Sequence, residues 1–183
     1  MGKLFKFGIV IGRFQTLHNG HREMIDYACK VCEKVGILIG SSQEFGTLKN
    51  PFTFEKRKQI LQRIYGNKIE IYPLPDIGVG NNSEWGKYVF KQIIYYFRKK
   101  PDVFISGKEE RRASWFDSNE FKGVSRIFVD KKIDISATKL REYLIAGNKE
   151  EWEKYVPEEI YYEYDIMRQI MLTAKNNTFS ASM

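Results

Sequence analysis

The decisive stretch of this sequence is Gly12-Arg13-Phe14-Gln15-Thr16-Leu17-His18-Asn19-Gly20-His21. It follows an apolar run over residues 7–11 and precedes a helix-like stretch over residues 21–34. The pattern predicts a strand that turns directly into a helix, with Asn19 as the helix N-cap. A helix N-terminus offers free N–H groups and the positive end of a dipole, so it attracts phosphate. The histidines and the arginine of this turn are therefore expected to contact a charged phosphate chain.

Strand-like apolar runs alternate with helix-like periodic segments along the rest of the chain. Strands are predicted at residues 6–11, 36–39, 69–72, 103–105 and 125–129. Helices are predicted at 21–34, 53–65, 83–99, 109–118, 138–146 and 157–174. This alternation predicts the α/β class, a Rossmann-like doubly wound parallel sheet with a C-terminal helical segment from about residue 136. The ligand site of such a sheet lies in the crevice at the carboxyl ends of its strands.

Length and composition set further limits. The chain has 183 residues, of which 43% are hydrophobic and 29% charged, as in an ordinary globular protein. We expect a single domain over residues 1–174 and a flexible, small and polar tail over 175–183. No apolar run approaches the roughly 20 residues that a membrane span needs, so we expect a cytoplasmic protein without a membrane partner. The net charge of +7 favours anionic partners, either nucleotides or nucleic acid.

The two cysteines, Cys29 and Cys32, form a C-x-x-C pair. A zinc site needs two more ligands nearby, and the sequence contains no second cysteine pair. The flanking residues are typical of a helix, so buried or half-buried thiols are predicted instead. No cluster of carboxylates suggests a metal site built by the protein itself.

Three motifs resemble those of one enzyme superfamily. The first stretch resembles the GRFQPxHxGH signature of the nucleotidylyltransferases, and residues 135–141 (ISATKLR) resemble their ISxTxxR motif. Residues 39–43 (IGSSQ) and 48–53 (LKNPFT) resemble archaeal-type nicotinamide mononucleotide (NMN) adenylyltransferases. The resemblance covers about residues 5–155. It implies transfer of the adenylyl group of ATP to NMN, by direct attack of the NMN phosphate on the α-phosphate, with NAD and pyrophosphate as products.

The resemblance also implies roles for individual residues. The catalytic group is expected to comprise His18, His21, Arg13 and Arg141, which suit contacts with phosphate oxygens. The ATP site is expected to comprise Gly12, Arg13, Phe14, His18, His21, Gly107, Ile135, Ser136, Thr138 and Arg141. Magnesium is the expected cofactor, bound mainly through the ATP phosphates.

The NMN side is expected to comprise Lys49, Asn82 and Trp85. The resemblance implies that an aromatic ring stacks on nicotinamide, and an indole face suits a flat cation. The alternative for Trp85 is a core residue at the start of a helix. Lys49 stands where the family often has an arginine that binds the NMN phosphate. Two motif positions depart from the family, because Thr16 replaces a proline and Ala137 a common glycine.

Two other functions are compatible with the sequence. The acceptor could be nicotinate mononucleotide or another small phosphate. A non-catalytic nucleotide- or RNA-binding module on the same fold is a second alternative, although an aromatic-studded basic surface is not evident and nucleic acid is not expected. The apolar positions of the last helix are expected to pack on the body or on another subunit, and we expect a homo-oligomer.

Overall fold

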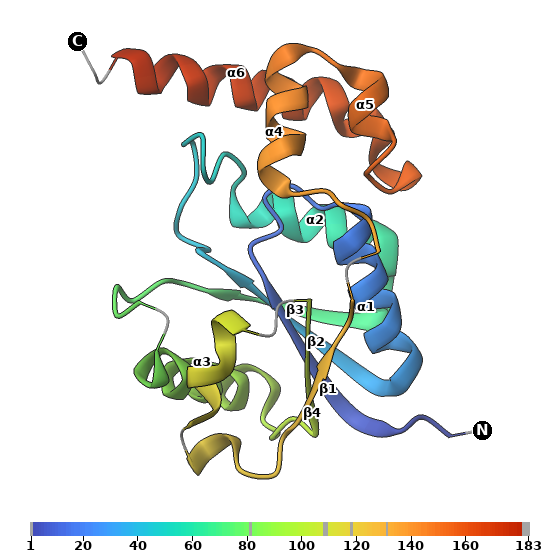
Figure 1. The fold of residues 1–183 in the computed structure, drawn as a ribbon, viewed down its shortest axis with the longest axis vertical. Coiled ribbons are helices and arrows are strands. Elements are labelled where there is room, and N and C mark those ends of the chain that lie inside the picture. Colours follow the sequence, from blue (N-terminus) through green and yellow to red (C-terminus); the bar gives the residue numbers. More distant parts are fainter. Residues whose placement is uncertain (1, 81, 108–109, 118, 131, 181–183) are drawn as a thin grey trace.

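A five-stranded parallel sheet forms the centre of the molecule (Figure 1). The computed structural model describes residues 2–80, 82–107, 110–117, 119–130 and 132–180. The strands are β1 (Phe5–Gly12), β2 (Cys32–Gly40), β3 (Ile69–Leu74), β4 (Val103–Ser106) and β5 (Ser125–Phe128), in the order β3-β2-β1-β4-β5. All four strand pairs are parallel. The chain thus builds outward from β1 in one direction and then returns to add β4 and β5 on the other side, which confirms the predicted fold class.

Helices cover both faces of this sheet because the strand side chains alternate between two cores. Val10, Ile37 and Ile105 point into the core that α1 (Asn19–Val31) and α2 (Phe54–Tyr65) cover. Ile9, Leu38 and Phe104, one position earlier or later, belong to the core under α3 (Ser83–Phe97). Figure 1 shows α3 on the other side of the sheet from α1 and α2.

The C-terminal segment forms a layer at one end of the sheet (Figure 1). It contains α4 (Ala137–Ala146), α5 (Lys149–Glu153), the short 3-10 helix η4 (Glu158–Glu163) and α6 (Tyr164–Ser180). Its buried side chains join the core of α1 and α2, among them Leu140, Leu144, Trp152, Ile160 and Met167. This shared burial explains why the segment docks on the body of the sheet.

Three short 3-10 helices connect the remaining elements: η1 (Gly66–Lys68), η2 (Glu110–Asp117) and η3 (Asn119–Phe121). The second of them packs closely on α3, because a Cβ atom built on Gly86 would lie 2.3 Å from the carbonyl oxygen of Trp115. Only a glycine allows the two backbones to approach this closely. Across the described parts of the chain, no helix has the length and apolar character needed to cross a bilayer.

Several predicted element boundaries need correction. The first helix ends at Val31, and residues 32–34, predicted as helix, begin β2 because Cys32 pairs with Phe5 of β1. The predicted helix over 109–118 is the 3-10 helix η2, and residues 109 and 118 lie outside the described part of the chain. The predicted last helix is divided into η4 and α6, and α6 continues to Ser180, past the predicted end at 174. Residues 181–183 of the predicted tail lie outside the described part.

Candidate active site

A cleft of about 330 Å³ lies where β1 and β4 end, between the start of α1 and the start of α4. At this position the strand order reverses, which opens a crevice in doubly wound sheets. All ten residues predicted for ATP line the cleft: Gly12, Arg13, Phe14, His18, His21, Gly107, Ile135, Ser136, Thr138 and Arg141. The fold therefore brings the first and second sequence motifs together across more than 100 residues of chain.

The two histidines form a stacked pair at the first turn of α1. Their ring centroids lie 3.7 Å apart with an interplanar angle of 24°, and the edge of Phe14 packs on His21. The N-cap of α1 is His18, because its Nδ1 accepts a hydrogen bond of 3.3 Å from the backbone N–H of His21. The predicted N-cap, Asn19, is wrong by one residue. Since Nδ1 is an acceptor, a neutral His18 carries its proton on Nε2, which makes that nitrogen a donor for phosphate.

Arg141 reaches the first motif from α4. Its Nη1 donates to the carbonyl oxygen of Gln15, and its Nη2 donates to Thr138 Oγ1 at 3.1 Å. Ser136 is the N-cap of α4 and accepts a hydrogen bond from the backbone N–H of Lys139 at 3.2 Å. The guanidinium is thus fixed in place, and the free N–H groups at the start of α4 lie at the same cleft, where they favour an anion.

The arginines of the site raise its positive charge. Burial, and then the nearby charge of Arg13, lower the pKa of Arg141. The same two causes, in the same order, lower the pKa of Arg57 to about 10. Arg141 and Arg57 still carry their charge at pH 7, so the fold holds each of them close to the like charge of Arg13. A phosphate chain in the cleft would relieve this repulsion, which is why the arrangement favours an anionic ligand.

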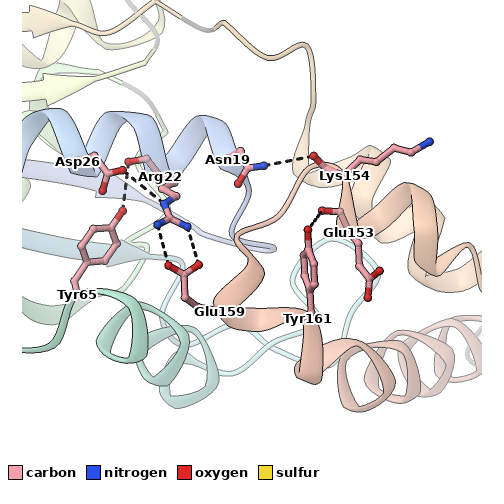
Figure 2. Close-up of polar contacts among 8 residues, drawn as sticks. All are labelled: Asn19, Arg22, Asp26, Tyr65, Glu153, Lys154, Glu159 and Tyr161. Atoms are coloured by element: carbon pink, nitrogen blue, oxygen red, sulfur yellow. Dashed lines mark hydrogen bonds and ion pairs between the residues drawn. The ribbon is translucent and has the colours of Figure 1, made fainter.

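Contacts between α1 and residues 154–159 dock the C-terminal segment on α1 (Figure 2). Arg22, next to His21, donates to both carboxylate oxygens of Glu159 at 2.7 and 2.8 Å. The backbone N–H of Asn19 donates to the carbonyl of Tyr155 at 2.8 Å, and its side-chain Nδ2 to the carbonyl of Lys154 at 3.5 Å. These contacts join the helix that carries the histidines to the segment that carries Arg141.

The predicted NMN-side residues do not line this cleft. Asn82 is the N-cap of α3, where its Oδ1 accepts from the backbone N–H of Trp85 at 3.0 Å. The indole of Trp85 is 8% exposed and belongs to the core under α3, where it packs edge-on against Trp115 at 6.2 Å between ring centroids. Trp85 is therefore buried in this structure, and its contact with nicotinamide stays a prediction. Lys49 is exposed on the loop after β2.

Two buried polar residues, Gln15 and Arg57, are not among the residues predicted for the site. Gln15 donates to the carbonyl of Phe52 and accepts from its N–H, both at 2.9 Å, and Arg57 is 1% exposed on α2. Arg57 shares its helix face with the buried Ile60, Leu61 and Tyr65. A charged residue at an apolar position of a helix pattern indicates that its side chain is buried and has a structural role. The sequence shows this pattern at Arg57.

The two cysteines lie in the described part of the chain, at the end of α1 and the start of β2. Cys32 is buried and Cys29 partly buried, both as free thiols, which confirms the prediction from the sequence. Burial raises the pKa of the Cys32 thiol to about 11, so the thiol stays protonated at pH 7. Within the part of the chain that the structure describes, no three His, Cys, Asp or Glu side chains gather as metal ligands.

Comparison with known proteins identifies the family. A family model described as cytidylyltransferase-like matches residues 9–143. The nicotinamide-nucleotide adenylyltransferase of Thermococcus kodakarensis is 32% identical over 163 residues, which cover 86% of this chain and 81% of the relative. The one from Pyrococcus horikoshii is 34% identical over 158 residues, with 84% and 79% covered.

A solved structure shares the fold. The bifunctional NMN adenylyltransferase/ADP ribose pyrophosphatase of Francisella tularensis, complexed with AMP and a manganese ion, superimposes with a TM-score of 0.73 at 23% identity. The match covers 97% of this chain but 54% of that protein, so this chain spans about half its length. From the family model and the archaeal relatives, this chain belongs to the cytidylyltransferase-like family and, within it, to the nicotinamide-nucleotide adenylyltransferases.

Proposed function

We propose that this protein transfers the adenylyl group of ATP to NMN, with NAD and pyrophosphate as products. One observation carries the proposal: two motifs that are distant in the sequence supply two histidines, two arginines and a helix N-terminus to a single cleft. In this reaction an NMN phosphate oxygen bonds to the α-phosphorus of ATP while the bond to the β-phosphate oxygen breaks. The reaction passes through no covalent enzyme intermediate, so the protein has to align two phosphates and neutralise charge.

The cleft residues suit these two tasks. His18 and His21 offer N–H donors beside the start of α1, and Arg13 and Arg141 offer guanidinium groups in the same cleft. Charge on the α-phosphate and on the leaving pyrophosphate grows toward the transition state. Donors that the fold holds in place stabilise that charge without reorganising, which is the largest single contribution in many enzymes.

We propose magnesium as the cofactor, carried in by ATP. The donors of the cleft are imidazole, guanidinium and hydroxyl groups, with Asp130 as the carboxylate among its lining residues. This set fits a cation held by phosphate oxygens and water, because magnesium prefers oxygen ligands and commonly keeps several waters. Bound in this way, a divalent cation would neutralise part of the triphosphate charge.

We also propose that the protein works in the cytoplasm as a homo-oligomer. Tyr162 and Ile166 of the C-terminal segment are 51% and 54% exposed, which leaves apolar surface available for a second subunit. Light scattering coupled to size-exclusion chromatography measures the oligomeric state, and a monomer at micromolar concentration would contradict the proposed homo-oligomer.

The acceptor is tested by comparing two substrates in separate reactions. The protein is incubated with magnesium and ATP plus either NMN or nicotinate mononucleotide, and the initial rates of dinucleotide formation are compared. We expect NAD from NMN at the higher rate. A higher rate with nicotinate mononucleotide would replace the acceptor but keep the reaction, whereas failure with both would remove the proposed activity.

A further inference from the structure

The backbone of Arg13 is held by a buried arginine from α2. Arg57 donates from Nη1 to the carbonyl oxygens of Arg13 at 2.9 Å and of Gly40 at 2.8 Å. Its Nη2 donates to the carbonyl of Ser41 at 3.1 Å, and its Nε to the carbonyl of Thr53 at 3.2 Å. One guanidinium thus joins the ends of β1 and β2 to the start of α2. Removing it would leave several backbone acceptors without this donor.

The side chain of Arg13 is held from the loop after β2. Its Nη1 donates to Asn50 Oδ1 at 3.4 Å, and Asn50 Nδ2 in turn donates to the carboxylate of Glu44. Asn50 is 1% exposed, and its backbone N–H donates to Thr47 Oγ1 at 3.0 Å. A primary amide suits this place because it accepts from a cation on one side and donates to an anion on the other.

This arrangement matters because Arg13 is an exposed side chain at the rim of the cleft. A free arginine side chain loses rotamer entropy when a ligand fixes it. A contact that restricts the side chain before ATP binds removes part of this cost. A hydrogen bond of 3.4 Å restricts the guanidinium and still leaves its other N–H groups for phosphate.

We infer that Asn50 is a positioning residue, which holds the guanidinium of Arg13 at the phosphate cleft while Arg57 fixes the backbone beneath it. The inference rests on the proposed function, because it assigns Arg13 to the ATP phosphates. It adds a second element to the site: the loop between β2 and α2 sets the geometry of the ATP side although its Asn50 does not line the cleft.

A double-mutant cycle tests the inference. The unmodified protein, Asn50→Ala, Arg13→Ala and the double variant are compared by ATP affinity in magnesium, from calorimetry, and by kcat and KM for NAD formation. We expect Asn50→Ala to weaken ATP binding about tenfold when Arg13 is present, and less than twofold when Arg13 is already alanine. A merely structural role of Asn50 predicts the same factor in both backgrounds, which would overturn the inference.

Thr47→Ala is the matched control. Its hydroxyl accepts from the backbone of Asn50 and shapes the same loop, but it leaves the amide bridge intact. An equal loss of ATP affinity in Thr47→Ala would show that loop order is responsible, and would also overturn the inference. The calorimetric cycle uses ATP alone, so a failure of NAD formation with intact coupling between Asn50 and Arg13 rejects only the proposed reaction. Absence of ATP binding by the unmodified protein would overturn both.

Discussion

The imidazole rings of His18 and His21 lie stacked at the first turn of α1, with centroids 3.7 Å apart. The stack is kept in register by the hydrogen bond from the backbone N–H of His21 to His18 Nδ1. A Cβ atom on Gly20 would lie 3.2 Å from His18 Nδ1, so the absence of a side chain at position 20 leaves room for the His18 ring. The two rings are therefore in direct contact at the cleft, and the effects of replacing them are expected to depend on each other.

Replacing His21 by alanine removes one of these two rings. We expect His21→Ala to lower kcat on the order of 10²-fold or more, because the lost donor stabilises charge that grows in the transition state. Steady-state kinetics with ATP and NMN give the rate, and a thermal melt reports folding. Lys30→Ala, an exposed position on the same helix, is the control. A near-normal kcat in His21→Ala with an unchanged melt would remove His21 from the mechanism.

Arg141→Ala is expected to lower kcat by a comparable factor, on the order of 10²-fold, for the same physical reason. Part of the effect will appear as lower stability, because the variant also loses the donors to Gln15 and Thr138. Kinetics at a temperature well below the melting point separate the two effects. The exposed Lys139 of the same helix, changed to alanine, serves as the comparison, and equal losses in the two variants would argue against a special role for Arg141.

Lys49→Ala is expected to change the KM for NMN, whereas Trp85→Ala is expected to lower the free energy of unfolding. Lys49 is exposed, so its loss should leave stability nearly unchanged. Because Lys49 is predicted to bind the NMN phosphate, its loss should raise the KM for NMN with little change in the KM for ATP. Added salt should narrow the difference in the KM for NMN between the variant and the unmodified protein. Trp85 is buried, so its loss should cost roughly 3–5 kcal/mol of unfolding free energy. Chemical denaturation and substrate-specific KM values measure these quantities. A stable Trp85→Ala protein with a raised KM for NMN would instead support stacking on nicotinamide.

The ion pair between Arg22 and Glu159 should make stability depend on pH. The hydrogen bond from Arg22 holds the pKa of the Glu159 carboxyl below its ordinary value of 4.5. The folded protein therefore binds that proton less tightly than the unfolded chain, and the stabilisation is complete above pH 4.5. It is lost as the pH falls through the lowered pKa of the folded state.

We therefore expect Glu159→Gln to cost at most about 1 kcal/mol near neutral pH, because the pair is partly exposed, and nothing in strong acid. Urea unfolding at several pH values measures the difference, with the exposed neighbour changed in Glu158→Gln as control. A difference that does not shrink below pH 4 would show that the carboxylate charge is not its cause.

Gly86→Ala should destabilise the protein more than an ordinary surface change. A new Cβ would lie 2.3 Å from the Trp115 carbonyl oxygen, a backbone atom, so α3 and η2 would have to separate. We expect a loss of about 1–3 kcal/mol or more. Lys87→Ala, the exposed next residue, is the control, and thermal denaturation of both variants measures the loss. A Gly86→Ala protein as stable as that control would mean that the contact is not tight in solution.

The sequence predicts the fold class, and it predicts which residues gather at the cleft, for a physical reason. Strand alternation and the turn after β1 are local features, and the motif residues carry their chemistry in their own side chains. Boundaries are less predictable: residues 32–34 are helix-like in composition, yet pairing of Cys32 with Phe5 makes them strand. That pairing is a tertiary contact, which a local pattern does not contain.

Contacts that depend on long-range geometry could not be predicted. The bridge from Arg13 through Asn50 to Glu44 requires a loop folded back on itself, and the four carbonyls around Arg57 come from three separate segments. The burial of Trp85 likewise depends on where η2 packs. The position of Arg57 on an apolar stripe was the one local signal available for these features.

Arg141 donates to the carbonyl of Gln15, a residue 126 positions earlier in the chain. A contact of this sequence separation closes late, because loop entropy has to be overcome before it forms. During synthesis the strands of the sheet and α1 emerge before α4. The nascent chain therefore lacks the side of the cleft that contains Arg141 until α4 has been made. Because α4 supplies one side of the cleft, a chain without α4 is expected to bind ATP more weakly, and bound ATP is expected to stabilise the chain that contains α4.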